Sequence, residues 1–286
     1  MTRLAHEGMD RQAAKGTFKA LSETIPHLKQ LGINVVELLP VFEFDENENP
    51  FRNPSSEDQL LNYWGYSPIL FQVPKQSYAK DFNNPEIEFR RMVDAFHQAG
   101  IEVWLDVVFN HTAELDDSGP VEHFKLLGRE DWYLLSKDGE FLNFSGCGNT
   151  FKCAGPGARR MIRDSLVYWA QNLGIDGFRF DLASILERDP NGNFHQGSEL
   201  LWELKNDPEL AGIKMIAEPW DAVGGYRLGY PSKNACWAEW NDFFRDTVRK
   251  AVRGDEGQMT ALKQAILGLS LIHISEPTRP LYISYA

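Results

Sequence analysis

Arg179 and Asp181 close an apolar stretch, residues 174–181, that has the length of a buried strand. Side chains alternate along a strand with a period of two, so these two charged groups lie on the same face. A cation beside Asp181 keeps the carboxylate ionised, which is the state that a nucleophile requires. The pattern is compatible with a catalytic nucleophile and with a structural ion pair at the end of a strand.

A second carboxylate, Glu218, ends another apolar run, 37 positions after Asp181. Its neighbours Ala217, Pro219 and Trp220 form a fairly apolar setting, which raises the pKa of a carboxyl group toward that of a working acid. Two carboxylates with different surroundings suit glycoside hydrolysis, in which one attacks the anomeric carbon and the other protonates the leaving oxygen. We expect the two carboxyl groups to face each other across about 5 to 6 Å, as a retaining mechanism requires.

Asp106, Asn110 and His111 form a third polar group, at the end of the apolar run 101–109. Together with Asp181 these side chains could instead ligate a metal ion. They offer only two carboxylates and one imidazole, however, without a compact ligand motif. We therefore expect neither a metal nor a cofactor.

The elements that must position these residues follow a repeating order. Apolar runs predict five strands, at residues 33–41, 101–109, 174–181, 213–220 and 236–241. Helical spacing of apolar residues predicts helices at about residues 18–31, 84–100, 157–173, 200–204 and 242–252. Two long loops, residues 42–82 and 107–156, separate some of them.

This alternation predicts an α/β fold with parallel strands and crossover helices. An open doubly wound sheet would usually carry a glycine-rich phosphate turn after its first strand, and the sequence has none. Polar residues instead follow four successive runs: Asp106 with Asn110 and His111, Arg179 with Asp181, Glu218, and Glu239. Such residues at the C-terminal ends of parallel strands are typical of the mouth of a (β/α)₈ TIM barrel, which is the fold we predict.

Composition and net charge limit the classes of molecule that we expect the protein to bind. The 286 residues carry a net charge of −12, which argues against nucleic acid and anionic membrane surfaces. No apolar run approaches membrane-spanning length. The three cysteines have no metal-ligand spacing and the N-terminal residues do not resemble a signal peptide, so we expect a reduced, cytoplasmic protein.

Three segments, residues 106–111, 177–181 and 217–220, resemble three of the four signature regions of the alpha-amylase superfamily, glycoside hydrolase family 13. They occur in the family's order, each at the end of a predicted strand. Other segments resemble its glycogen-debranching and isoamylase branch: residues 36–41, 62–66, 144–150 and 237–241. The resemblance covers roughly residues 1–268.

The resemblance implies a retaining hydrolase of alpha-1,6 branch linkages in glycogen or related alpha-glucans, with Asp181 as nucleophile and Glu218 as general acid/base. Arg179 would orient Asp181. The resemblance also implies substrate-binding roles, with packing under a loop as the alternative for the two aromatic residues; these residues are Tyr66, Asp106, Asn110, His111 and Trp220. Tyr66 would stack beneath the sugar.

The sequence also departs from the family. A third carboxylate, an Asp after a His on the seventh strand, has no counterpart after Glu218. We therefore expect residues 1–268 to be a partial barrel domain of about strands two to six of eight, with a long insertion at 107–156. Residues 269–286 resemble a translated sequencing adapter rather than the family.

Three functions remain open from the sequence. The first is the debranching hydrolase, represented here by an inactive fragment. The second is a branching or other glucan transferase, which shares the nucleophile and the acid. The third is a non-catalytic protein that binds alpha-glucan polysaccharides or oligosaccharides.

Overall fold

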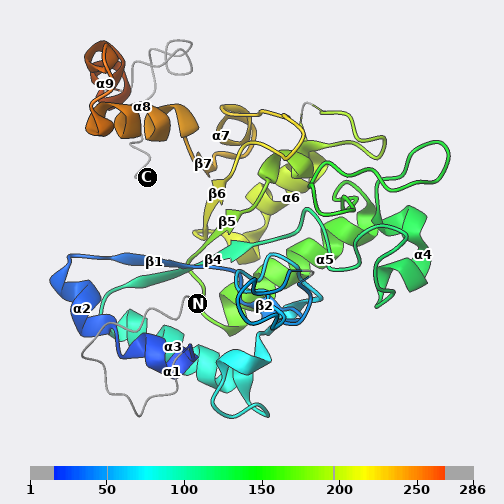
Figure 1. Cartoon of the computed structure of the whole chain (residues 1–286), viewed down its shortest axis with the longest axis horizontal. Coiled ribbons are helices and arrows are strands. Elements are labelled where there is room, and N and C mark those ends of the chain that lie inside the picture. Colours follow the sequence, from blue (N-terminus) through cyan, green and yellow to red (C-terminus); the bar gives the residue numbers. More distant parts are fainter. Residues whose placement is uncertain (1–15, 50, 196, 268–286) are drawn as a thin grey trace.

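The structure, a computed structural model, describes residues 16–49, 51–195 and 197–267 (Figure 1). Its centre is a parallel sheet of five strands: β1 (Val35–Leu38), β4 (Glu102–Val107), β5 (Gly177–Phe180), β6 (Lys214–Ala217) and β7 (Ala238–Glu239). Each lies within one of the five predicted apolar runs. The predicted tail, residues 269–286, lies outside the described residues.

The strands cross the sheet in the order β1-β4-β5-β6-β7, which is also their order along the chain. A doubly wound sheet reverses its strand order at a switch point, and this sheet does not. Consecutive winding of parallel strands is the arrangement in the wall of a (β/α)₈ barrel. The predicted fold class is therefore confirmed, as a partial barrel whose edges, among the described residues, are β1 and β7.

Helix α3 (Pro85–Gln98) begins at a proline, whose missing N–H costs nothing in the first turn. Its buried face is Phe89, Met92, Val93 and Phe96. Ile87 was expected on this face but is 48% exposed. At about 100° per residue, Ile87 points away from the other four, so the prediction was wrong for this residue.

Helix α5 (Pro156–Val167) continues into the π-helical turn η2 (Tyr168–Asn172), close to the predicted helix. Helical spacing predicts one buried face, which is confirmed because Ile162, Leu166, Trp169 and Leu173 are all fully buried. Trp169 from η2 donates its indole N–H to the carbonyl oxygen of Phe71 at 2.8 Å. The helix is thereby tied to strand β3 (Leu70–Pro74).

The expected single helix at residues 18–31 is two helices, α1 (Phe18–Ser22) and α2 (Ile25–Gln30). The hydroxyl of Thr24 donates to the carbonyl of Leu21 at 2.7 Å and closes the first helix, while Pro26 starts the second. Helices α6 (Glu199–Asn206) and α8 (Asp242–Arg253) lie where they were predicted.

The predicted loops contain structure that the sequence did not indicate. In residues 42–82, β2 (Phe42–Glu43) pairs with β3 (Leu70–Pro74), and the 3₁₀ turn η1 (Gln76–Tyr78) follows. In residues 107–156, α4 (Phe124–Trp132) is capped by the buried carboxylate of Glu114, which accepts from backbone N–H groups at its start. Further unpredicted elements are η3 (Ala183–Glu187), η4 (Pro208–Leu210), α7 (Tyr230–Ala235) and α9 (Gln258–Ile266).

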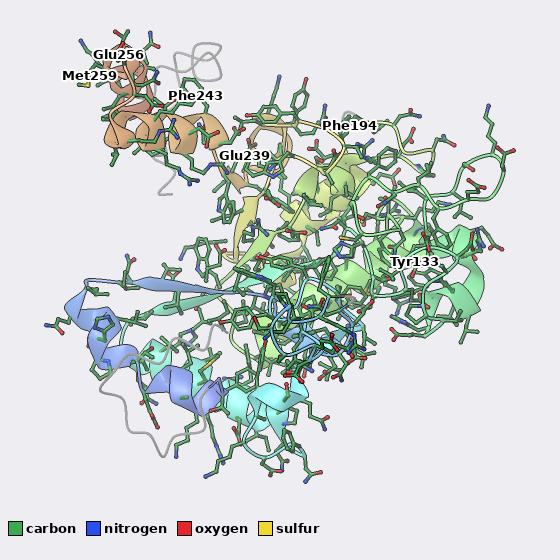
Figure 2. All side chains as sticks on the ribbon, viewed as in Figure 1. Tyr133, Phe194, Glu239, Phe243, Glu256 and Met259 are labelled. Atoms are coloured by element: carbon green, nitrogen blue, oxygen red, sulfur yellow. The ribbon has the colours of Figure 1, made fainter. Side chains whose placement is uncertain are left out.

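Helices α8 and α9 form a hairpin that projects from the sheet (Figure 1). Phe243 and Met259, both on this hairpin, are exposed (Figure 2). Within the described parts of the chain, no helix is long and apolar enough to cross a membrane.

Candidate active site

Parallel pairing brings the predicted site residues to one end of the sheet. Asp106 of β4 lies opposite Arg179 of β5, which lies opposite Ile216 of β6. The ladder continues past the strand ends, because the N–H of Asp181 donates to β4 at 3.0 Å and that of Glu218 donates to β5 at 3.1 Å. Backbone hydrogen bonds therefore fix the relative positions of all four functional side chains.

Arg179 lies at the centre of a cluster with Asp106, Asp181 and Glu218, called the Arg179 cluster below. Its Nη1 donates to Oδ1 of Asp106 at 2.7 Å and to Oδ1 of Asp181 at 3.0 Å. Its Nη2 is 3.1 Å from Oε2 of Glu218. The side chain is only 4% exposed. If all three carboxyl groups were ionised, two negative charges would remain unbalanced in a buried space, so the arrangement favours protonation of at least one of them.

Asp181 and Glu218 are both bound by the guanidinium of Arg179, which holds the two carboxyl groups near each other. Burial raises the pKa of Glu218, Arg179 lowers it, and the charge of Asp181 raises it again. The raised pKa favours a protonated Glu218, the state that a general acid needs. The separation of about 5 to 6 Å expected for a retaining pair stays a prediction.

Asp106 is 2% exposed. Besides Arg179, the hydroxyl of Tyr66 donates to its carboxylate. Burial raises the pKa of Asp106 to about 7, against the opposing effects of Arg179 and Tyr66. Burial of Tyr66 raises the pKa of its hydroxyl, and the charge of Asp106 raises it further. The phenol therefore stays protonated and donates to Asp106.

Asn110 and His111 support the cluster from one side. Nδ2 of Asn110 donates to the backbone carbonyl of Asp181 at 2.8 Å and to its Oδ2 at 2.9 Å, which turns Oδ1 of Asn110 toward Nδ1 of His111. Nε2 of His111 donates to the carbonyl of Tyr66 at 2.8 Å. Both ring nitrogens face acceptors, which favours the imidazolium. Burial lowers the pKa of His111, but Cys147, Asp181 and the carbonyl of Tyr66 raise it by more.

The chain is similar to known proteins over most of its length. Residues 6–143 match the family model for the alpha amylase catalytic domain. The chain is 42% identical to isoamylase 3, chloroplastic, of Oryza sativa subsp. japonica, over 96% of this chain and 35% of the relative. It is 43% identical to the glycogen debranching enzyme of Enterobacter sp. (strain 638), over 82% of this chain and 35% of that protein.

The chain belongs to the alpha-amylase superfamily.

Solved structures of this superfamily resemble the fold as well. The pullulanase of Anoxybacillus sp. LM18-11, solved with maltotriose, superposes with a TM-score of 0.72 at 27% identity, over 91% of this chain and 39% of that one. The chain thus spans about a third of the length of the curated relatives that it matches.

Two further residues, the predicted sugar-binding Trp220 and the strand-end carboxylate Glu239, have their described contacts with other residues than Arg179. Trp220 is half-buried in the loop after Glu218, where its backbone pairs with Tyr226 and its ring lies 6.0 Å from the guanidinium of Arg245. Glu239 accepts a hydrogen bond from the N–H of Gly229 and so anchors the loop after β6 (Figure 2). A sugar-binding role for Trp220 stays a prediction.

Two residues beside the site were missed. Burial raises the pKa of the Cys147 thiol, but the nearby His111 lowers it by more, and the guanidinium of Arg179 lies 4.2 Å from the ring centroid of Trp240. Cys147 lies in the segment 144–150, which the family resemblance marked without giving this side chain a role. Trp240 directly follows β7, and its place at a strand end was the available signal.

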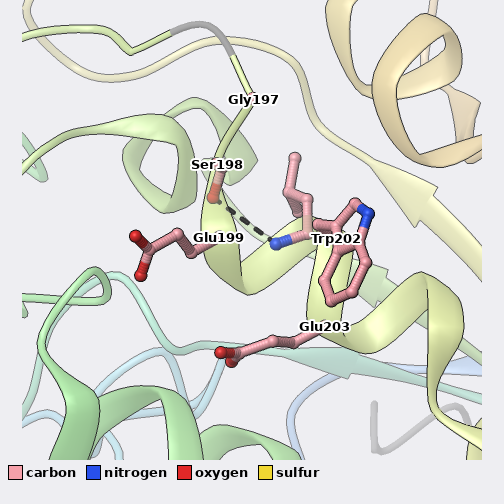
Figure 3. A pocket seen from close by; sticks show the side chains of 6 residues that line it. Gly197, Ser198, Glu199, Trp202 and Glu203 are labelled. Carbon is pink, nitrogen blue, oxygen red and sulfur yellow. Dashed lines mark hydrogen bonds between the residues drawn. The ribbon is translucent and has the colours of Figure 1, made fainter.

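No group of three or more His, Cys, Asp or Glu suited to a metal ion occurs among the residues that the structure describes. A pocket of about 380 Å³ lies elsewhere, at the start of α6, and is lined by Gly197, Ser198, Glu199, Leu201, Trp202 and Glu203 (Figure 3). The carboxylates of this pocket, on Glu199 and Glu203, are bound to Arg159 and are 71% and 40% exposed, whereas those of Asp181 and Glu218 are 14% and 12% exposed. Burial favours a shifted pKa, so the Arg179 cluster is the better candidate for acid and nucleophile chemistry.

Proposed function

We propose that this chain carries the catalytic carboxylates of a retaining glycoside hydrolase that cleaves alpha-1,6 branch linkages of glycogen or a related alpha-glucan. The observation that carries the proposal is the pair Asp181 and Glu218, both largely buried and both bound by Arg179, at 3.0 and 3.1 Å. One anion, one neutral acid and a cation between them is the charge state that glycosyl transfer to a carboxylate needs.

In the first step, a carboxylate oxygen of Asp181 attacks the anomeric carbon while Glu218 gives its proton to the leaving glycosidic oxygen. The carbon–oxygen bond to the leaving sugar breaks as the glycosyl–Asp181 ester forms. In the second step, Glu218 takes a proton from water, and the resulting hydroxide equivalent displaces Asp181. Two inversions at the anomeric carbon give retention.

The surrounding residues suit a sugar in the cleavage position. We assign Asp106 and His111 to its hydroxyl groups, as the family resemblance implies, with the buried carboxylate of Asp106 as an acceptor. Tyr66 and Trp220 supply aromatic surfaces, and Asn110 holds the backbone of Asp181.

The substrate class rests on the relatives, which are named isoamylase, glycogen debranching enzyme and pullulanase. We extend the alpha-glucan substrate to this chain and propose a cytoplasmic location, as for an enzyme that acts on stored glycogen. Net charge of −12 disfavours nucleic acid as a partner.

We further propose that the chain is part of a longer enzyme, referred to below as the full-length enzyme. The sheet edges at β1 and β7 expose backbone groups that a closed barrel would pair. A third carboxylate, which the family resemblance requires, would come from outside this chain. Expressed alone, residues 1–286 should aggregate and show no activity on glycogen or pullulan.

The test is to trap the glycosyl-enzyme. The full-length enzyme is treated with a 5-fluoro-alpha-glucosyl fluoride, and the labelled peptide is identified by mass spectrometry. Label on Asp181, slower labelling in Glu218→Gln, and cleavage of pullulan but not of linear amylose would support the proposal. Label on another residue would contradict the assignment of the nucleophile, and cleavage of amylose alone would contradict the linkage.

Transfer of glucan chains is measured in the same reactions. An enzyme that mainly makes longer branched products, with little new reducing sugar, would be a transferase. The labelled residue would then still be Asp181, so the two functions are separated by products and not by the nucleophile.

A further inference from the structure

Trp240 lies against the guanidinium of Arg179, the cation that binds all three carboxyl groups of the cluster. The guanidinium carbon of Arg179 is 4.2 Å from the centroid of its indole ring, within the range of a cation–π interaction. Arg179 is 4% exposed in its side chain, whereas Trp240 is 36% exposed. The indole therefore separates the buried guanidinium from solvent.

The backbone of Trp240 is held on both sides. Its N–H donates to the carbonyl of Ala217, the residue before Glu218, at 2.9 Å. The next residue, Asn241, caps α8 by accepting from the N–H of Phe244 at 3.0 Å. Strand pairing and the helix cap thus fix the ring over the end of β5 and β6.

The guanidinium has one donor that the carboxylates do not bind. Its Nη1 and Nη2 bind Asp106, Asp181 and Glu218, but its Nε is buried with no hydrogen-bond partner among the residues that the structure describes. A stacked ring restrains the plane of a guanidinium and excludes water, so its charge is less screened.

We propose that Trp240 is a positioning residue, which stacks on Arg179 and keeps its guanidinium dry and aimed at Asp181 and Glu218. The proposal rests on the proposed function, since it gives Arg179 a task in glycosyl transfer. Trp240 acts through Arg179 and needs no contact with the sugar.

The other role for an exposed aromatic ring near a glycosidase site is a platform for a sugar. The two roles differ in kinetics. Loss of a platform weakens binding and raises KM, whereas loss of a positioning residue lowers kcat at similar KM. Phenylalanine keeps a ring over the cation and should preserve most of the positioning.

The experiment compares Trp240→Ala and Trp240→Phe in the full-length enzyme, with Trp202→Ala as a matched control. Trp202 is 64% exposed on α6 and lies outside the Arg179 cluster. We expect kcat on pullulan to fall by about 10- to 100-fold in Trp240→Ala, with KM changed by less than about threefold. Trp240→Phe should recover most of kcat, and Trp202→Ala should match wild type.

A double-mutant cycle with Arg179→Lys tests whether the effect passes through Arg179. We expect Trp240→Ala to lower kcat much less in the Arg179→Lys background, because the stacked guanidinium is already gone. Full additivity of the two losses would overturn the proposal, as would a rise in KM at constant kcat.

A failure of the proposed function can be distinguished from a failure of the positioning role of Trp240. If wild type does not cleave pullulan, the kinetics are measured on the linkage that it does cleave. The cycle is also measured on the thermal unfolding midpoint, which needs no activity. Coupling of Trp240 and Arg179 in the midpoint supports the contact, and its absence contradicts it.

Discussion

The molecule contains two buried arginine clusters whose charges are balanced in different ways. In the Arg179 cluster, one guanidinium serves three carboxyl groups. In the second cluster, each arginine has its own carboxylate: Arg188 pairs with Asp221, and Arg227 pairs with Glu187 at 3.2 Å.

Each arginine of the second cluster also lies against two aromatic rings. The guanidinium of Arg188 lies 3.8 Å from the ring centroid of Phe144 and 4.1 Å from that of Phe194. That of Arg227 lies 4.9 Å from Phe194 and 3.6 Å from Tyr230. This cluster joins three loops at their bases. Paired arginines and carboxylates in equal number suit a structural role. An excess of carboxyl groups favours protonation of one of them, as an acid catalyst requires.

The largest expected effects come from making the same substitution in both clusters. Asp181→Asn should lower kcat by roughly 10⁴-fold or more, since the nucleophile is lost, while the thermal midpoint stays the same or rises because excess negative charge is removed. Asp221→Asn should instead cost about 3 to 5 kcal/mol of unfolding free energy, because Arg188 would be left buried without a counter-ion. Pullulan kinetics and urea unfolding measure both, and equal effects on stability would remove the distinction between the clusters.

Glu218→Gln should lower kcat by about 10² to 10⁴-fold on substrates with poor leaving groups. The acid must be protonated, so activity of the wild type falls as pH rises through the raised pKa of Glu218. The Gln variant should lack this basic limb in its pH–rate profile. Glu239→Gln, which alters a carboxyl group outside the cluster, should keep the limb.

Glu187 of the second cluster should make the free energy of unfolding depend on pH. Burial raises the pKa of Glu187 from its ordinary 4.5 to about 6, against the effect of Arg227. The folded state binds this proton more tightly than the unfolded chain. Protonated Glu187 therefore adds its full contribution to the free energy of unfolding below pH 4.5, and this contribution is lost as pH rises to about 6. We expect a loss of about 2 kcal/mol over this window. Urea unfolding of wild type minus Glu187→Gln isolates it, and a flat difference would contradict the prediction.

The smallest effect is expected for the ring that the two arginines share. Phe194 is 37% exposed and lies in the loop before α6 (Figure 2). Phe194→Leu should cost about 1 kcal/mol of stability through the lost cation–π contacts and leave kcat unchanged. Phe144→Leu, which removes a ring from Arg188 alone, is the comparison; an equal or larger loss there would show that sharing adds nothing.

The sequence predicted the parts of the molecule that follow from local pattern. Asp106, Arg179 and Glu218 each come at the end of an apolar run, and parallel strands bring such ends together, so their meeting was foreseeable. Their use in catalysis stays a proposal. The strands and the longer helices were likewise visible, because their apolar spacing extends over many residues.

The sequence could not predict contacts made between distant loops. Arg188, Phe194 and Asp221 lie in segments without periodicity, and only the fold brings them together. Strand β3 was missed because its pairing with β2 is non-local and short. The binding of three carboxyl groups by one guanidinium depends on side-chain geometry, which spacing along the sequence does not encode.

The strand register has a consequence for how this site can diversify. Asp181 and Glu218 are held by backbone bonds to neighbouring strands, and the loops that follow them enter separately. An insertion or deletion in the loop before α6, or in the loop between β6 and α7, would leave those bonds in place. If the proposed function holds, the length and shape of the glucan accepted could change by loop evolution or by engineering, one loop at a time, while the sheet keeps the spacing of Asp181 and Glu218.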